Sequence, residues 1–472
     1  MTMPRSTPAS EGVDGRGLLG LLDAMESDGH GFHSLMIARH GRVIAEGWWA
    51  PYRRDRMHLG YSLTKSFTAT VLGDLVGRGM IDLDAPVLSY LGAWESASPK
   101  WRRVTVRHCI TMTVGHTTDA WEWRGDSAPP LPATDGDPLL TLILARDPDG
   151  EPGEVWAYNQ VATYLAAQAI AAASGEPLST HLRRLLLDPF GGAAAAVQRT
   201  PQGRDLGFSG LQLTTPAILA LAQTWLDGGV WQGTRLVPAD YAEWAPQPSP
   251  VSLAAEGAGD WACGYGSSFW GERHGYRGDG AFGQFAMVLP AQDVAVAITS
   301  EVEVMQDVLD QLWEHLLPAI DGEPDAHADE QLARRLAELA HRPLSGAERR
   351  IPVRAVRDEA SQLPESYRTA SLETTPGGHH LLAIDHPAGE LVTVIGDGQW
   401  LESRWATPAG SELAVMASGA WRRGAFHAQL RLVETPHMIL VELDRDTGRV
   451  RLDWRLVPLT GTDPLALAAF PI

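Results

Sequence analysis

A serine and a lysine three residues apart, Ser62 and Lys65, are the residues of this sequence whose types and spacing best suit chemistry. A serine hydroxyl is a weak nucleophile at neutral pH and needs a base within hydrogen-bond reach. Lysine can be that base when burial lowers the pKa of its amine. Apolar residues at helical spacing predict a helix over residues 68–80, directly after the pair. Ser62 and Lys65 would then share one face near the helix N-terminus, where the helix dipole favours a developing negative charge.

Two later segments carry residues that could complete such a site. Tyr158 and Gln160 follow a Pro-Gly turn and stand at the predicted start of a helix, from which a phenol can point into a cleft. Gln160 could either contact a substrate or cap that helix. Gly278 and Gly280 lie in a run that leads into a predicted strand, and glycines let a substrate approach the backbone closely.

The elements that must position these residues form two parts. Hairpins are predicted at 34–48 and 285–299, with helices between them, so the first part is α+β with an antiparallel sheet assembled from distant parts of the chain. We expect a disordered N-terminus over 1–17, a folded domain over 18–320 with a helical subdomain beside the sheet, and a long loop over 119–137.

The last third of the chain has a different pattern. Residues 321–344 read as a polar linker followed by a helix. Beyond them, apolar and polar residues alternate in several short runs separated by turns, as in Phe426, Ala428, Leu430 and Leu432. The sequence therefore predicts a small all-β domain, a barrel or a sandwich, over 345–472.

Composition restricts the classes of partner. The length of 472 residues favours two domains, and the formal net charge of −20 disfavours a nucleic acid or an anionic membrane as a partner. The two cysteines form neither a disulfide framework nor a metal-type cluster. A secretory signal and a long apolar run are both missing from the sequence, so a cytoplasmic location without membrane attachment is the default expectation.

Taken in order, the three motifs resemble the serine β-lactamase and penicillin-binding-protein superfamily. The closest likeness is to class C β-lactamase-like serine hydrolases and esterases. That family places S-x-x-K first, a Tyr-x-Asn element further along, and a Lys-Thr-Gly or His-x-Gly strand near the end of the domain. The stretches 104–115 and 210–216 also look like segments of the family. The resemblance covers about residues 18–320, and appended lipocalin-like β domains occur in relatives.

The sequence departs from the family pattern in two places. Gln160 stands where the family has asparagine. The third motif has no Lys-Thr-Gly, and His274 and Arg277 are the nearby positively charged candidates for recognising a substrate carboxylate.

The resemblance implies acyl transfer without a metal or an organic cofactor. Ser62 would attack a carbonyl, Lys65 and Tyr158 would share the proton transfers, and the N–H groups of Ser62 and of Gly278 or Gly280 would hold the oxyanion. The predicted function is a serine hydrolase that cleaves an ester or amide of a small molecule or peptide.

Two alternatives remain open. One is a transacylase or peptide-cyclising thioesterase, in which an amine replaces water as the acceptor. The other is an inactive binding or scaffold protein of the same fold, which the changes at Gln160 and in the third motif would favour.

Overall fold

The computed structural model describes residues 3–27, 31–93, 95, 97–118, 136–255, 257–346 and 352–472, so most of the predicted 119–137 loop lies outside the described residues. Contacts divide the chain into two compact units. The first, here called the sheet–helix unit, comprises Met1–Gly47, Gly60–Leu336 and Pro471–Ile472. The second, here called the barrel unit, comprises Trp48–Leu59 and Ala337–Phe470.

A six-stranded sheet forms the centre of the sheet–helix unit, with the strand order β2-β1-β11-β10-β9-β8. The central strands β1 and β11 pair in antiparallel fashion and come from opposite ends of the unit's sequence. The α+β class and the assembly of the sheet from distant segments are therefore confirmed. The strands are β1 (Gly31–Arg39), β2 (Arg42–Trp48), β8 (Trp270–Glu272), β9 (Gly275–Gly280), β10 (Gln284–Leu289) and β11 (Val294–Glu301).

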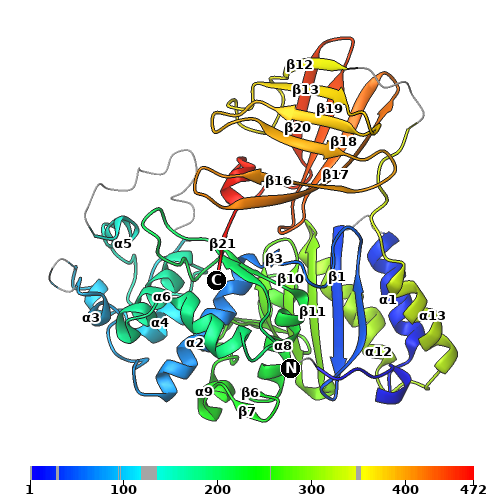
Figure 1. Ribbon diagram of the computed structural model, residues 1–472. Helices are drawn as coiled ribbons and strands as arrows, with labels where there is room; N and C mark the ends of the chain where they lie inside the picture. The colour runs from blue at the N-terminus through cyan, green and yellow to red at the C-terminus, as the bar shows by residue number, and fades with distance from the viewer. Residues whose placement is uncertain are drawn as a thin grey trace. The chain divides into compact units, whose positions relative to one another are not determined.

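Both faces of this sheet are covered. Every residue of β1, β10 and β11 is buried, which is the pattern of a sheet with packed layers on each side. Helix α8 (Thr215–Leu226) packs on β1, β10 and β11, whereas α1 (Gly15–Ser27) packs on α11 (Met305–Gln311) and α12 (Leu317–Ala319) (Figure 1).

Among the described residues, this unit has nine further α-helices and four short strands. The helices are α2 (Thr64–Gly77), α3 (Leu88–Leu91), α4 (Val106–Ile110), α5 (Pro138–Leu144), α6 (Gln160–Ser174), α7 (Leu178–His181), α9 (Ala239–Trp244), α10 (Pro250–Leu253) and α13 (Ala326–Ala337). The small strands are β4 (Ala195–Val197), β5 (Leu211–Leu213), β6 (Val230–Trp231) and β7 (Thr234–Arg235), and they pair as β4–β5 and β6–β7.

The barrel unit is a nine-stranded, nearly closed sheet with the order β15-β14-β13-β12-β20-β19-β18-β17-β16 (Figure 1). The two end strands of this order approach each other, since the Val394 N–H of β15 donates to Ser403 Oγ of β16 at 2.9 Å. The strands are β12 (Val353–Arg357), β13 (Thr369–Thr374), β14 (His380–Ile384), β15 (Leu391–Ile395), β16 (Leu401–Ala406), β17 (Glu412–Arg422), β18 (Ala425–Leu432), β19 (Met438–Asp444) and β20 (Arg449–Trp454). Two-residue strands occur at β3 (His58–Leu59) and β21 (Phe470–Pro471).

The alternating pattern of the last third is confirmed as a barrel. Phe426, Ala428, Leu430 and Leu432 are all buried, while residues between the first three are partly exposed. The side chains of successive strand residues point to opposite faces, so the apolar set fills the interior.

Two expectations about the chain need correction. The N-terminus is ordered from residue 3 onward, because the Val43 N–H donates to Pro4 O at 2.9 Å and the Ser6 N–H donates to Val43 O at 2.9 Å. A polar composition suggested disorder, but these backbone bonds tie the segment to β2. The barrel unit also includes Trp48–Leu59, a segment that the sequence placed inside the first domain.

Candidate active site

The turn that carries Ser62 is held by backbone and side-chain hydrogen bonds. Residues Tyr61–Leu63 form one turn of 3-10 helix that runs directly into α2 at Thr64. The Gly60 N–H donates to Leu211 O at 2.9 Å, and Thr64 Oγ1 donates to Tyr61 O at 2.6 Å. The helical run therefore begins before residue 68, where the apolar spacing alone placed it, and Lys65 lies in its first turn.

Lys65 is the centre of the polar contacts around this turn. Its side chain is 1% exposed, and its Nζ donates to Ser62 Oγ at 3.0 Å, Gln160 Oε1 at 2.5 Å and Phe208 O at 2.9 Å. An ammonium has three N–H donors, so these three acceptors match its full capacity. The arrangement fixes the amine beside the serine hydroxyl.

Tyr158 and Gln160 reach this amine from the segment that leads into α6. The cap of the helix is Asn159, whose Oδ1 accepts from the Val161 N–H at 3.1 Å. Gln160 is the first residue of α6 and binds Lys65, so of the two roles left open by the sequence, the cap belongs to its neighbour. Lys65 Nζ lies 4.8 Å from the centre of the Tyr158 ring. The three side chains of Ser62, Lys65 and Tyr158 are thus brought together.

An aromatic group fixes the Tyr158 ring. Trp270 stacks on it with ring centres 5.6 Å apart, and Tyr265 meets it edge-on at 5.8 Å. Trp156 packs in turn against both of these rings. Such contacts restrict the ring to one orientation beside the lysine.

Strand β9 packs directly on the serine turn. A Cβ added at Gly280 would lie 2.0 Å from Gly60 O, and one added at Gly278 would lie 2.7 Å from Ser66 Oγ. Only residues without a side chain permit this approach. The backbone of β9 is therefore next to the turn.

Arg277 points away from this turn. It alternates with Gly278 and Gly280 along β9, so its side chain lies on the opposite face of the sheet. It is fully buried, with Nε donating to Asp279 Oδ2 at 2.9 Å and Nη1 donating to Gly271 O at 3.1 Å. We leave Arg277 out of the proposed site, because its guanidinium is not accessible to a substrate.

His274 is also remote from the serine turn. It lies four residues before Gly278, in the turn between β8 and β9, and its ring packs on Trp313 at 4.8 Å between ring centres. A strand rises about 3.3 Å per residue, so this position is more than about 10 Å along β9 from the glycine that touches Ser66. His274 is not carried forward as a substrate contact.

Behind β9 lies a buried charged cluster of Glu272, Arg277 and Asp279. Glu272 Oε2 is 3.5 Å from Arg277 Nη1, and burial raises the pKa of Glu272 to about 8 despite that cation. Burial also raises the pKa of Asp279, opposed by Arg277 and more weakly by Lys65. The cluster makes the environment of this strand sensitive to pH.

Several contacts of the site were not predicted from the sequence. The Phe208 atom that accepts from Lys65 is its backbone carbonyl oxygen. Every residue has such an oxygen, so the pattern of residue types could not identify this contact. Trp270 and Tyr265 were not singled out, although two aromatic residues close to the third motif were a usable signal. Their role depends on ring packing across distant segments. Trp121 and Trp123 of the predicted 119–137 loop lie outside the described residues.

Other chemistries find little support in the described part of the chain. Among those residues, no group of three or more His, Cys, Asp or Glu side chains is arranged to hold a metal ion. Cys109 is buried, which raises the pKa of its thiol and keeps it from acting as a thiolate nucleophile. Within the same residues, every helix is too short or too polar to cross a bilayer.

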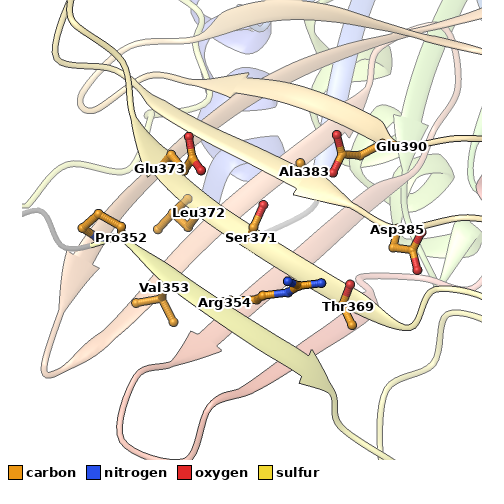
Figure 2. Close-up of a pocket in the computed structure, with 10 residues that line it drawn as sticks. All are labelled: Pro352, Val353, Arg354, Thr369, Ser371, Leu372, Glu373, Ala383, Asp385 and Glu390. Atoms are coloured by element: carbon orange, nitrogen blue, oxygen red, sulfur yellow. The ribbon is translucent and has the colours of Figure 1, made fainter.

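A pocket of about 420 Å³ opens on the outer face of β12, β13 and β14 in the barrel unit (Figure 2). Thr369 and Ser371 supply hydroxyls to it, and the charged side chains around them are exposed. The lining residues are Pro352, Val353, Arg354, Thr369, Ser371, Leu372, Glu373, Ala383, Asp385 and Glu390. This set contains no lysine and no histidine, and its carboxylates, Glu373, Asp385 and Glu390, are all exposed to solvent.

The fold and the Ser-x-x-Lys turn are those of serine β-lactamase-like and penicillin-binding-protein-like proteins. The family model described as Beta-lactamase matches residues 23–317, which is more than half of the chain, and the chain belongs to that family. The resemblance on which the sequence interpretation relied is thereby confirmed.

Curated relatives and solved structures extend this comparison. The chain is 28% identical over 214 residues to esterase EstB of Burkholderia gladioli, covering 40% of this chain and 54% of that protein. It is 29% identical over 224 residues to the 6-aminohexanoate-dimer hydrolase of Paenarthrobacter ureafaciens, covering 44% of this chain and 56% of that protein. The chain thus spans about half the length of these relatives.

The structural neighbours support the fold. The D-amino acid amidase of Ochrobactrum anthropi, solved with L-phenylalanine amide, aligns with a TM-score of 0.51 at 19% identity, covering 65% of this chain and 97% of that one. A penicillin-binding-protein homologue of Caulobacter crescentus aligns with a TM-score of 0.50 at 16% identity, covering 67% and 99%.

Proposed function

We propose that this protein is a serine hydrolase that cleaves an ester or amide of a small molecule or peptide through an acyl-enzyme on Ser62. The observation that carries the proposal is the contact of 3.0 Å between Lys65 Nζ and Ser62 Oγ, with the lysine buried. The relatives named above include an esterase and a 6-aminohexanoate-dimer hydrolase, which supports hydrolysis as the reaction class.

Lysine, unlike arginine, can lose its proton and act as a base. The sequence of 472 residues contains two lysines, Lys65 and Lys100. All the other residues in its combined count of 38 lysines and arginines are arginines. Arginine stays protonated and cannot accept a proton from serine. The Lys65 ammonium must first lose a proton; the neutral amine can then accept the Ser62 proton across the same contact, which leaves the oxygen free to attack a carbonyl carbon.

Tyr158 would complete the proton transfers. Its ring centre lies 4.8 Å from Lys65 Nζ, and the proposed role of the phenol is to give a proton to the leaving group while it takes one from the lysine. Gln160 would hold the amine in place through its Oε1. The acyl-enzyme is then released by water, with the same groups acting in reverse.

The developing oxyanion would be held by the N–H of Ser62 and by one from β9. Gly278 and Gly280 both bring the β9 backbone against the serine turn, and we propose that one of the two supplies the second donor. Each such donor stabilises the transition state by about 3 kcal/mol in well-studied acyl-transfer enzymes.

The test is covalent labelling of the intact protein with a fluorophosphonate, followed by intact-mass measurement and peptide mapping. We expect one adduct per chain, located on Ser62 and absent from Ser62→Ala. The matched control is Ser371→Ala, which removes a hydroxyl of the barrel pocket and should label like the wild type. Absence of labelling at every pH between about 6 and 10 would instead support a non-catalytic protein.

A panel of chromogenic esters and amides then separates the possible substrates. Trapped acyl-enzymes identify the acyl half by their mass, and the same reaction with added amines reports whether water is the acceptor. Turnover that is lost in Ser62→Ala is the expected result.

A further inference from the structure

The boundary between the two units falls between Leu59 and Gly60, directly ahead of the serine turn. The segment Trp48–Leu59 leaves the sheet–helix unit after β2, belongs to the barrel unit, and returns to deliver Ser62. The contacts of this segment are therefore made by the residues that directly precede the turn.

Backbone hydrogen bonds attach the segment to the barrel unit at both of its ends. The Ala50 N–H donates to Leu339 O at 3.0 Å, and the His341 N–H donates to Ala50 O at 2.8 Å. Near the other end, the Leu59 N–H donates to Glu434 O at 2.9 Å. This last bond lies three residues ahead of Ser62.

Arg56 makes the strongest side-chain attachment. Its side chain is 5% exposed, and its guanidinium donates to both carboxylate oxygens of Glu402, at 2.8 and 3.2 Å. Glu434 lies further off, with Oε1 3.9 Å from Arg56 Nη1. A bidentate pair between arginine and carboxylate fixes direction as well as distance. Tyr52 adds an apolar attachment by packing on Ala414, Val433 and Met416.

The turn itself contains a residue that needs such support. Tyr61, adjacent to Ser62, has φ of +46°, a left-handed conformation that costs a non-glycine residue about 1–2 kcal/mol. A backbone conformation of this kind persists only where its surroundings hold it. On the downstream side, Thr64 Oγ1 donates to Tyr61 O, and the Tyr61 ring packs on Phe282 at 5.4 Å. On the upstream side, the chain is held by the barrel unit through Leu59 and Arg56.

We propose that Arg56 is a positioning residue for Ser62, because it holds the segment of chain that leads into the serine turn. Arg56 contacts neither Ser62 nor Lys65. It acts on Ser62 through the residues that join the two, 57–61. The expected effect on the reaction rate rests on the proposed function. The expected effect on the conformation of the serine turn does not.

The experiment compares Arg56→Gln with Arg53→Gln in the full-length protein. Arg53 lies in the same segment, but its side chain is 59% exposed and pairs with Asp55. Two readouts are taken on folded protein well below its melting temperature: the rate of Ser62 labelling with turnover of a chromogenic ester, and hydrogen exchange of peptides that cover residues 60–64.

We expect Arg56→Gln to lower kcat and the labelling rate by about 10- to 100-fold, the cost of misplacing a catalytic group by about 1 Å, with KM little changed. Exchange of the amides in 60–64 should become faster, while that of β1 and β11 stays the same. Arg53→Gln should alter neither readout. Glu402→Gln leaves the carboxylate of Glu434 near Arg56 and should give a smaller change in the same direction. This variant replaces Arg56→Gln in the test if Arg56→Gln does not fold.

The outcomes separate the two proposals. If the wild type is not labelled at Ser62, the proposed function fails, and the exchange of residues 60–64 alone decides whether Arg56 holds the turn. If Arg56→Gln and Glu402→Gln keep both the labelling rate and the exchange of these amides at wild-type values, the positioning role is refuted.

Discussion

Hydroxyl groups meet charged side chains in two regions of this molecule, and the two regions are built differently. At Ser62, the charge is a single lysine that is 1% exposed and whose Nζ contacts three oxygen atoms. In the barrel pocket, Thr369 and Ser371 lie among Arg354, Glu373 and further carboxylates that are exposed to solvent (Figure 2).

The difference shows what turns a hydroxyl into a candidate nucleophile. Exposed charges are screened by water and contribute little to the reactivity of a neighbour. A buried amine in contact with the oxygen is held at the distance that proton transfer requires. The number of polar groups is therefore less informative than the burial and identity of the single group that touches the hydroxyl.

The largest effect should come from removing the base without removing its charge. Lys65→Arg keeps a cation in the site but cannot accept a proton, so we expect ester hydrolysis to fall by about 10²- to 10⁴-fold. Steady-state turnover of a chromogenic ester measures this. Lys100→Arg is the control, because Lys100 Nζ binds only the carbonyls of Pro148 and Asp149 among the contacts described, and its rate should equal that of the wild type. Equal rates in both variants would contradict the role of Lys65.

The next effect concerns the phenol beside the lysine. Tyr158→Phe retains the ring that packs on Trp270 but removes the hydroxyl, and we expect turnover to fall by at least about 10²-fold. Tyr276→Phe removes a different hydroxyl, which donates to Trp225 O at 3.0 Å, and should leave turnover unchanged. An unaltered rate in Tyr158→Phe would mean that Lys65 acts without the tyrosine.

A smaller effect, on stability, distinguishes the close packing of β9 from the open surface of the barrel. Gly280→Ala would place a Cβ 2.0 Å from Gly60 O, so we expect it to lower the free energy of unfolding by about 1–3 kcal/mol. In the barrel unit, a Cβ added at Gly377 would have no other atom closer than 3.8 Å. Gly377→Ala should therefore change the free energy of unfolding by less than about 0.5 kcal/mol. Chemical denaturation measures both, and similar values would refute the tight contact at Gly280.

A further expected effect is a change in how the free energy of unfolding varies with pH. Glu272 has a pKa of about 8 because of its burial, above the usual value of 4.5, so the folded state retains its proton longer than the unfolded state does. Its contribution to stability is complete below about pH 4.5 and is lost as the pH rises toward 8. Glu272→Gln should therefore flatten the decline in stability over this window.

The matched control is again in the barrel pocket. Glu373 is exposed, and Glu373→Gln should leave the pH dependence of the wild type unaltered. Denaturation midpoints measured between pH 4.5 and 8.5 test both variants. A decline that persists unchanged in Glu272→Gln would show that another group is responsible.

Much of this architecture could be predicted from local patterns. Alternation of apolar residues identified the strands around Phe426 and Leu430, because a barrel wall has one dry face and one wet face. The hairpin over 34–48 was recognisable by its turn at His40-Gly41 and matches β1 and β2. Ser62 and Lys65 were identifiable because their spacing places both on one helical turn.

Other features depended on register and on partners from elsewhere in the chain. Arg277 was expected to face a substrate because it is charged and adjacent to Gly278. A shift of one residue along a strand reverses the face, and the packing of Gly278 on Ser66 determines which face that is. The sequence left open whether Gln160 caps the helix. In the structure Asn159 is the cap, and the side-chain oxygen of Gln160 accepts from Lys65.

The sequence alone determined the residue types able to carry acyl transfer, their order, and the division into an α+β part and an all-β part, because these depend on side-chain chemistry and local periodicity. Only the tertiary structure decided that residues 48–59 belong with the barrel unit, that the Phe208 carbonyl reaches Lys65, and that Arg277 is buried away from the serine turn. These are contacts between segments distant in sequence, and no local pattern encodes the packing that selects them.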